Sequence, residues 1–91
     1  RGDIALSPTN LRRTDSMLVW DGVNAHGGKS VACYVVYAFP SQSSVDFNNP
    51  AYIKAVTSGC QVQIDPSVEA IYCVTAINRY KQESLPCILV N

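Results

Sequence analysis

The chain has 91 residues, of which 47% are hydrophobic and 15% charged, and its seven basic and seven acidic side chains cancel. A chain of this length forms one domain with one core, which leaves no room for a second lobe around a deep catalytic cleft. The balanced charge offers no basic surface to nucleic acid, and no run approaches the roughly 20 apolar residues of a membrane helix, so we expect neither a nucleic-acid partner nor membrane insertion.

The start of the chain indicates a fragment of a longer protein. The chain does not begin with Met, and its first residues lack the apolar segment of a signal peptide. We therefore expect a single domain over residues 1–91, with residues 1–8 as a linker that leads into it.

Short strands separated by turn residues are predicted along the chain, because Val, Ile, Thr and Tyr favour strands. Seven strands are expected, at Thr9–Arg13, Ser16–Asp21, Val31–Phe39, Ile53–Thr57, Cys60–Ile64, Glu69–Asn78 and Cys87–Val90. Seven short strands at even spacing are typical of an all-β fold, an antiparallel sandwich of two sheets.

The connections between these strands are mostly polar. Val23–Ser30 and Arg79–Ser84 are predicted loops, and Ser41–Val45 is a Ser-rich connection that we expect to be flexible. Asn49 precedes Pro50, which is the pattern of a helix N-cap followed by proline at the first helical position. One helical turn is therefore expected there.

Alternation of side chains within the strands predicts which residues face the core. The expected inward residues are Leu11, Leu18, Trp20, Tyr34, Val36, Ile64, Tyr72 and Val74. On the same alternation Cys33, Val35, Tyr37 and Cys73 face outward. Four aromatic residues are candidates for exposed rings and so for a surface that binds carbohydrate or protein: Tyr37, Phe39, Tyr52 and Tyr80.

The four cysteines are Cys33, Cys60, Cys73 and Cys87, and none is spaced as C-x-x-C. The single histidine is distant from them in sequence, so we expect no zinc site and no other cofactor. We interpret them as thiols. A bridge between Cys33 and Cys73 stays open, although the expected diagonal register places them about 7–8 Å apart, outside the usual disulfide reach.

No catalytic arrangement emerges from the sequence. His26 and Asp21 are the only imidazole and carboxylate close together, and they share a glycine-rich segment without a rigid element to hold them in hydrogen-bonding geometry. A thiol nucleophile paired with His26 lacks any predicted group that would lower its pKa. We therefore expect that this domain is not an enzyme.

Several of these stretches together resemble a fibronectin type III domain, an immunoglobulin-like sandwich. They are Leu11, Leu18-Val19-Trp20, Tyr34-Val35-Val36-Tyr37, Ile64-Asp65-Pro66, Tyr72-Cys73-Val74-Thr75-Ala76 and Glu83-Ser84-Leu85-Pro86-Cys87. The resemblance implies that the Tyr72 hydroxyl returns to the backbone near residues 65–67 as a tyrosine corner. The interval from Ile64 to Tyr72 is two residues longer than the family pattern. Some type III domains present Arg-Gly-Asp to integrins in the loop before the last strand, whereas Arg1-Gly2-Asp3 lies at the chain terminus and is interpreted as chance.

A narrower resemblance concerns Tyr-Val-Val-Tyr-x-Phe-Pro, Asn-Pro-x-Tyr-Ile and Val-Thr-Ala-Ile-Asn-Arg. It is similar to type III modules at the C-terminal end of bacterial secreted glycosyl-hydrolase-like proteins, including those of gut Bacteroides. The resemblance implies an extracytoplasmic, monomeric, non-catalytic accessory or spacer domain, whose partner is an upstream catalytic domain of the same chain. The alternative is a carbohydrate- or protein-binding module that uses the exposed aromatics.

Overall fold

The computed structural model of the chain describes residues 7–22, 31–78 and 80–89. Its strands are β1 (Thr9–Thr14), β2 (Met17–Asp21), β3 (Val31–Phe39), β4 (Ile53–Thr57), β5 (Gln61–Gln63), β6 (Ile71–Asn78) and β7 (Cys87–Ile88). Two short 3₁₀ turns, η1 (Gln42–Ser44) and η2 (Pro50–Tyr52), lie between β3 and β4.

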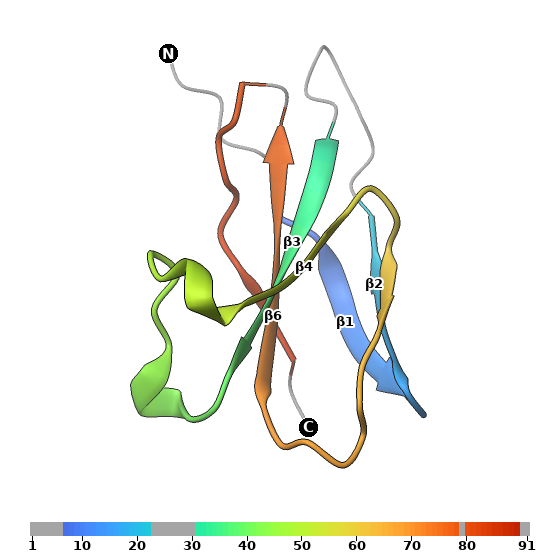
Figure 1. The fold of residues 1–91 in the computed structure, drawn as a ribbon. Helices are drawn as coiled ribbons and strands as arrows, with labels where there is room; N and C mark the ends of the chain where they lie inside the picture. The colour runs from blue at the N-terminus through green and yellow to red at the C-terminus, as the bar shows by residue number, and fades with distance from the viewer. Residues whose placement is uncertain (1–6, 23–30, 79, 90–91) are drawn as a thin grey trace.

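These strands form two antiparallel sheets that pack together as a sandwich (Figure 1). One sheet has the order β1-β2-β5 and the other the order β4-β3-β6-β7. The all-β sandwich architecture expected from the strand pattern is therefore present.

The strand boundaries differ from the sequence prediction where side chains or turns intervene. β6 begins at Ile71 and not at Glu69, and the segment before it contains a turn in which Asp65 Oδ1 accepts two hydrogen bonds from Ser67. β5 is reduced to Gln61–Gln63, and β7 ends at Ile88 in the described part of the chain.

The β3–β4 connection contains both short 3₁₀ turns. The predicted helical turn after Asn49 is confirmed: the Asn49 side-chain oxygen accepts a hydrogen bond of 3.0 Å from the Ala51 N–H, with Pro50 at the first helical position. Residues Ser41–Val45 contain the 3₁₀ turn η1, whereas the sequence predicted only a flexible link.

The space between the sheets is filled by one hydrophobic cluster. Its buried members are Leu11, Leu18, Trp20, Tyr34, Val36, Ile64, Tyr72, Val74 and Ala76, which include every residue expected to face inward. The Trp20 and Tyr34 rings meet edge to face, with centroids 5.6 Å apart. Each large apolar side chain buried in this way contributes about 1.5–3 kcal/mol relative to exposure.

The end of β2 approaches this cluster closely at Gly22. A Cβ atom added at Gly22 would lie 2.8 Å from the Tyr34 hydroxyl oxygen and 2.9 Å from the Cys60 sulfur. Both distances are shorter than van der Waals contact, so a side chain at this position would force the Tyr34 hydroxyl or the Cys60 sulfur to move.

Tyr72 is buried in the core, but the expected tyrosine corner is absent. Its hydroxyl makes no hydrogen bond with the described residues, although its backbone carbonyl accepts one of 3.0 Å from the Leu89 N–H. The longer interval between Ile64 and Tyr72 accounts for the difference, because the intervening 65–70 segment forms its own turn through Asp65 and Ser67.

Truncation of a core leucine should separate buried from exposed apolar side chains. Leu18→Ala is expected to lower the free energy of unfolding by about 2.7–5 kcal/mol, because Leu18 is fully buried and its loss leaves a cavity. The matched control Leu85→Ala removes the same atoms from a side chain that is 74% exposed, and should change stability by less than about 0.5 kcal/mol. Urea unfolding measures both, and equal effects would contradict this placement of the core.

Candidate functional site

A second hydrophobic cluster covers the outer face of the β4-β3-β6-β7 sheet. Its buried members are Val35, Tyr37, Phe39 and Cys73, and Phe47, Tyr52, Ile71 and Ile77 pack against them. The register explains the grouping, since Tyr37 pairs with Cys73 and Phe39 with Ile71, which places these side chains on one face of the sheet. The second cluster is therefore separate from the core between the sheets.

The β3–β4 connection supplies the cover for this second cluster. The Phe47 ring meets Tyr37 edge to face at 4.9 Å and Phe39 at 5.2 Å, measured between ring centroids. Tyr52 meets Phe39 at 5.3 Å, and Tyr37 stacks on Phe39 at 5.7 Å. In Figure 1 this connection, drawn in green, lies beside the lower part of β3 and β6.

The prediction of an exposed aromatic surface was wrong for Tyr37 and Phe39. They face outward from the sheet, as alternation indicated, but they are only 3% and 0% exposed because the β3–β4 connection folds over them. Tyr52 is half-buried in the same cluster, and only Tyr80 is largely exposed, at 68%. The four rings do not form a common binding platform.

A carboxylate closes one side of this cluster. Glu83 Oε2 accepts hydrogen bonds from the Tyr37 hydroxyl at 2.5 Å and from the Thr75 hydroxyl at 2.6 Å. We call these three residues the outer-face latch. Thr75 is 1% exposed, so the latch joins the β6–β7 segment to the middle of β3 and β6.

The latch has the properties of a structural contact. Burial, followed by the hydrogen bond and the negative charge of Glu83, raises the pKa of the Tyr37 phenol well above its usual value. Tyr37 therefore stays protonated at neutral pH and acts as a hydrogen-bond donor, not as a base or nucleophile. Hydrogen bonds to a charged acceptor contribute about 1.5–3 kcal/mol each. Because Glu83 itself is exposed, we expect values at or below the lower end of this range for the latch.

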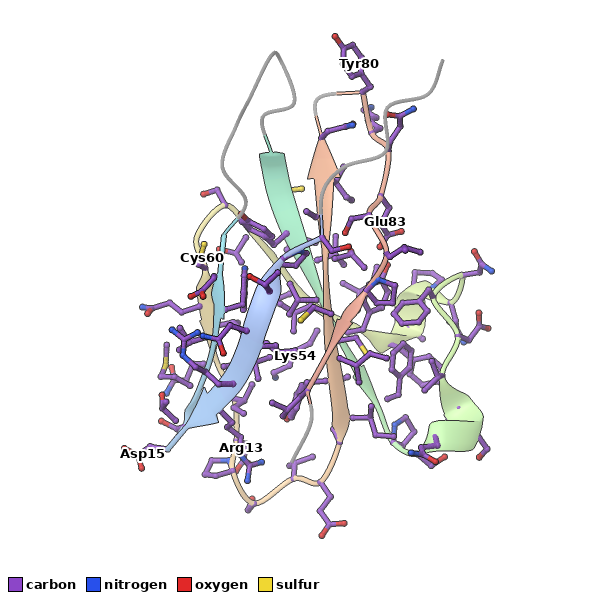
Figure 2. The ribbon with its side chains drawn as sticks, turned by 180° about the vertical axis from the view of Figure 1, so that it is seen from behind. Arg13, Asp15, Lys54, Cys60, Tyr80 and Glu83 are labelled. Atoms are coloured by element: carbon purple, nitrogen blue, oxygen red, sulfur yellow. The ribbon has the colours of Figure 1, made fainter. Side chains whose placement is uncertain are left out.

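Asn78 organises the loop between β6 and β7 above the latch. Its side-chain oxygen accepts hydrogen bonds from the N–H groups of Tyr80 and Gln82, and its amide donates to the Gln82 side chain at 3.0 Å. Further along, the Ser84 hydroxyl accepts a bond of 2.9 Å from the Ala76 N–H. Tyr80 is thus presented at the tip of a loop held by side chains, at one end of the molecule (Figure 2).

The four cysteines are free thiols. Cys33 pairs with Ile77 while Cys73 pairs with Tyr37, so the two sulfurs lie four residues apart along the ladder, about 13 Å, and not on a close diagonal. Burial raises the pKa of Cys73 to about 11, with a smaller contribution from Cys87. Cys73 is therefore protonated and unreactive at neutral pH.

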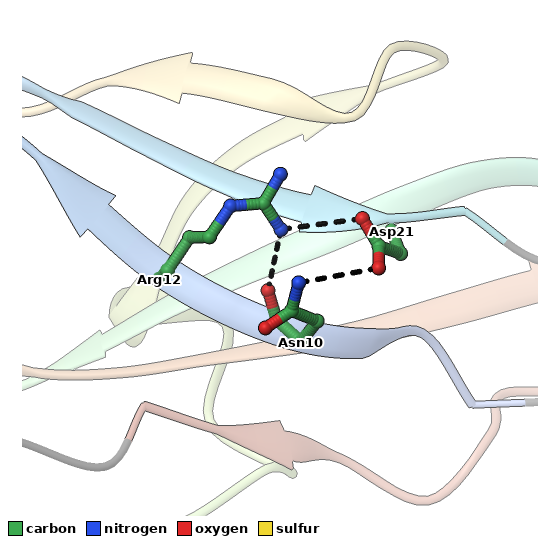
Figure 3. Close-up of polar contacts among 3 residues, drawn as sticks. All are labelled: Asn10, Arg12 and Asp21. Atoms are coloured by element: carbon green, nitrogen blue, oxygen red, sulfur yellow. Dashed lines mark hydrogen bonds and ion pairs between the residues drawn. The ribbon is translucent and has the colours of Figure 1, made fainter.

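The other residues considered for catalysis are not brought together. His26 and the Arg1-Gly2-Asp3 sequence lie outside the described residues. Asp21 instead closes a surface cluster with Arg12 and Asn10 (Figure 3): Arg12 Nη1 lies 3.2 Å from Asp21 Oδ1, and Asn10 Nδ2 donates to Asp21 Oδ2 at 3.3 Å. Asn10 has a φ of 56° at the irregular pairing of β1 with β2, so this cluster stabilises a bulge. An exposed ion pair of this kind contributes about 0–1 kcal/mol.

Two open grooves flank the β5–β6 segment. One has a volume of about 470 Å³ and is lined by Ser16, Lys54, Gln63, Ile64, Asp65 and Pro66. The other, of about 380 Å³, is lined by Arg13, Pro40, Glu69, Ala70 and Ile71. We call them the Lys54 groove and the Arg13 groove. Sequence reasoning missed both, since each is assembled from separate segments.

The described residues contain no group of three or more His, Cys, Asp or Glu side chains arranged to hold a metal ion. No helix in the described part of the chain is long and apolar enough to cross a membrane.

Comparison of the chain with protein-family models, curated protein sequences and solved structures gave no match. A function for the chain therefore has to be inferred from the geometry of the described residues.

The latch can be tested by a double-mutant cycle. Tyr37→Phe and Glu83→Gln should each destabilise the fold, and their coupling free energy is expected to be about 1–1.5 kcal/mol because the two side chains bond directly. The control pair Tyr80→Phe and Glu69→Gln removes the same groups from exposed positions and should show coupling near zero. Additive effects of the first pair in urea unfolding would show that the latch contributes no interaction energy.

Proposed function

We propose that the chain is a fibronectin type III-like, immunoglobulin-like sandwich of seven strands, serving as a non-catalytic accessory or spacer domain of a secreted glycoside-hydrolase-like protein. The observation that carries the proposal is the strand order. β1, β2 and β5 correspond to strands A, B and E of immunoglobulin-like sandwiches, and β3, β6 and β7 to strands C, F and G. β4 joins the second sheet beside β3, as strand C′ does in variable-type domains.

The path of the chain supports a role as a spacer. Ser7 lies beside Leu85, to whose carbonyl its hydroxyl donates at 2.9 Å, whereas the Leu89 N–H bonds to Tyr72 near the start of β6. These two points lie about four residues apart along β6, roughly 13 Å. The chain therefore enters and leaves at different levels of the sandwich, an arrangement suited to domains connected in series.

The thiols are compatible with an extracytoplasmic location. Oxidising compartments favour disulfides where cysteines meet. Here Cys33 and Cys73 are separated along the ladder, and Cys73 and Cys87 occupy opposite faces, since Cys87 pairs with Val74 and packs toward the core. Cys73 is also fully buried, so the fold limits its access to oxidants.

The parent gene provides the test. The reading frame is expected to continue upstream of Arg1 into a barrel-sized domain with two carboxylates at strand ends, which are the catalytic groups of glycoside hydrolases. Replacement of residues 1–91 in that protein by a Gly/Ser linker should leave kcat for a small soluble glycoside within about twofold, because the reacting groups lie elsewhere. A start codon directly before Arg1, or loss of more than about tenfold in kcat, would contradict the proposal.

A further inference from the structure

The Lys54 groove combines segments from both sheets. Lys54 comes from β4, Ser16 from the β1–β2 turn, and Gln63 to Pro66 from the end of β5 and the turn after it. Arg13 and Asp15, on either side of the end of β1, lie at the end of the sandwich opposite Tyr80, and Lys54 lies nearer the middle (Figure 2). The groove has a volume of about 470 Å³ and is open to solvent, since Lys54, Gln63, Asp65 and Pro66 are exposed.

The polar side chains of Lys54, Gln63 and Asp65 around this groove are exposed and make few hydrogen bonds to other described residues. Among the described residues the only ion pair joins Arg12 to Asp21, so the Lys54 ammonium forms none there. Asp65 Oδ1 receives both bonds from Ser67, at 2.9 and 2.7 Å, and Oδ2 receives none within the described part of the chain. The bonds from Ser67 lower the pKa of Asp65, which keeps the carboxylate charged at neutral pH.

The chemistry of these groups selects a class of ligand. One ammonium and one carboxylate cancel, so the groove has no net attraction for an anion or a cation. Together with the Gln63 amide and the Ser16 hydroxyl they offer both donors and acceptors. A sugar hydroxyl can donate to Asp65 and accept from Lys54 at once, and the Pro66 ring offers an apolar surface to the C–H face of a sugar.

We propose that the Lys54 groove binds a neutral saccharide unit. The site differs from the aromatic platform expected from the sequence, because it uses polar side chains and no aromatic ring. The saccharide site is also independent of the proposed accessory role. That role concerns the parent protein and is tested by the sequence upstream of Arg1. A shallow, open site of this kind predicts weak affinity, in the millimolar range.

The test is a titration of the ¹⁵N-labelled 91-residue chain with maltose, cellobiose, xylobiose and N,N′-diacetylchitobiose, each to about 10 mM, roughly tenfold above a millimolar Kd. At least one disaccharide should shift the amide signals of Gln63, Asp65 and Lys54 in a saturable manner. Asp65→Asn and Lys54→Met should each weaken binding by about tenfold, the effect of losing one charge-assisted hydrogen bond.

Glu69→Gln is the matched control, because it neutralises a carboxylate of the same connecting segment in the Arg13 groove. It should leave the affinity unchanged and the chain folded, and the ¹⁵N spectra of all three variants verify their fold. Absence of shifts with every disaccharide would overturn the proposal. Shifts confined to the Arg13 groove, or equal weakening by all three variants, would overturn it as well.

Discussion

The antiparallel pairing of β3 with β6 is the contact on which the rest of the structure depends. The ladder extends from Val31–Asn78 to Phe39–Ile71, and each of its two strands contributes buried residues to both hydrophobic clusters. The space between the sheets is filled by Tyr34, Val36, Val74 and Ala76. On the outer face, the β3–β4 connection packs over Val35, Tyr37 and Cys73. Because both faces are buried, a register slip of one residue would exchange the two sets of side chains and disrupt both clusters.

The parts of the fold that depend on local pattern could be predicted from the sequence. Alternation assigned the inward side chains of β2, β3 and β6, and Asn49 with Pro50 marked η2, because a strand's period and a helix cap are set by neighbouring residues. The lengths of the short strands β5 and β7 were overestimated. Their lengths depend on pairing with other strands, as where the Ile64 N–H bonds to the Ser16 carbonyl across from it, and a single segment does not reveal such pairing.

Burial on the outer face could not be predicted in the same way, since it requires a distant segment to fold back. Phe47 lies in a polar stretch and gives no periodic signal, yet its ring buries Tyr37 and Phe39. One signal was present: Val31–Phe39 has no charged or amide side chain at any position, as in strands buried on both faces. Glu83 and the groove residues are likewise brought to their partners only by the tertiary fold, so no spacing in the sequence identifies them.

Amide hydrogen exchange measured residue by residue tests the central position of this ladder most directly. If β3 and β6 form the centre of a sheet covered on both faces, the amides of Val35, Val36, Val74 and Thr75 should exchange only through global unfolding. Their free energies of opening should then equal the free energy of unfolding measured in urea. Opening free energies lower than that value by more than about 2 kcal/mol at the outward-facing positions Val35 and Thr75 would contradict the account.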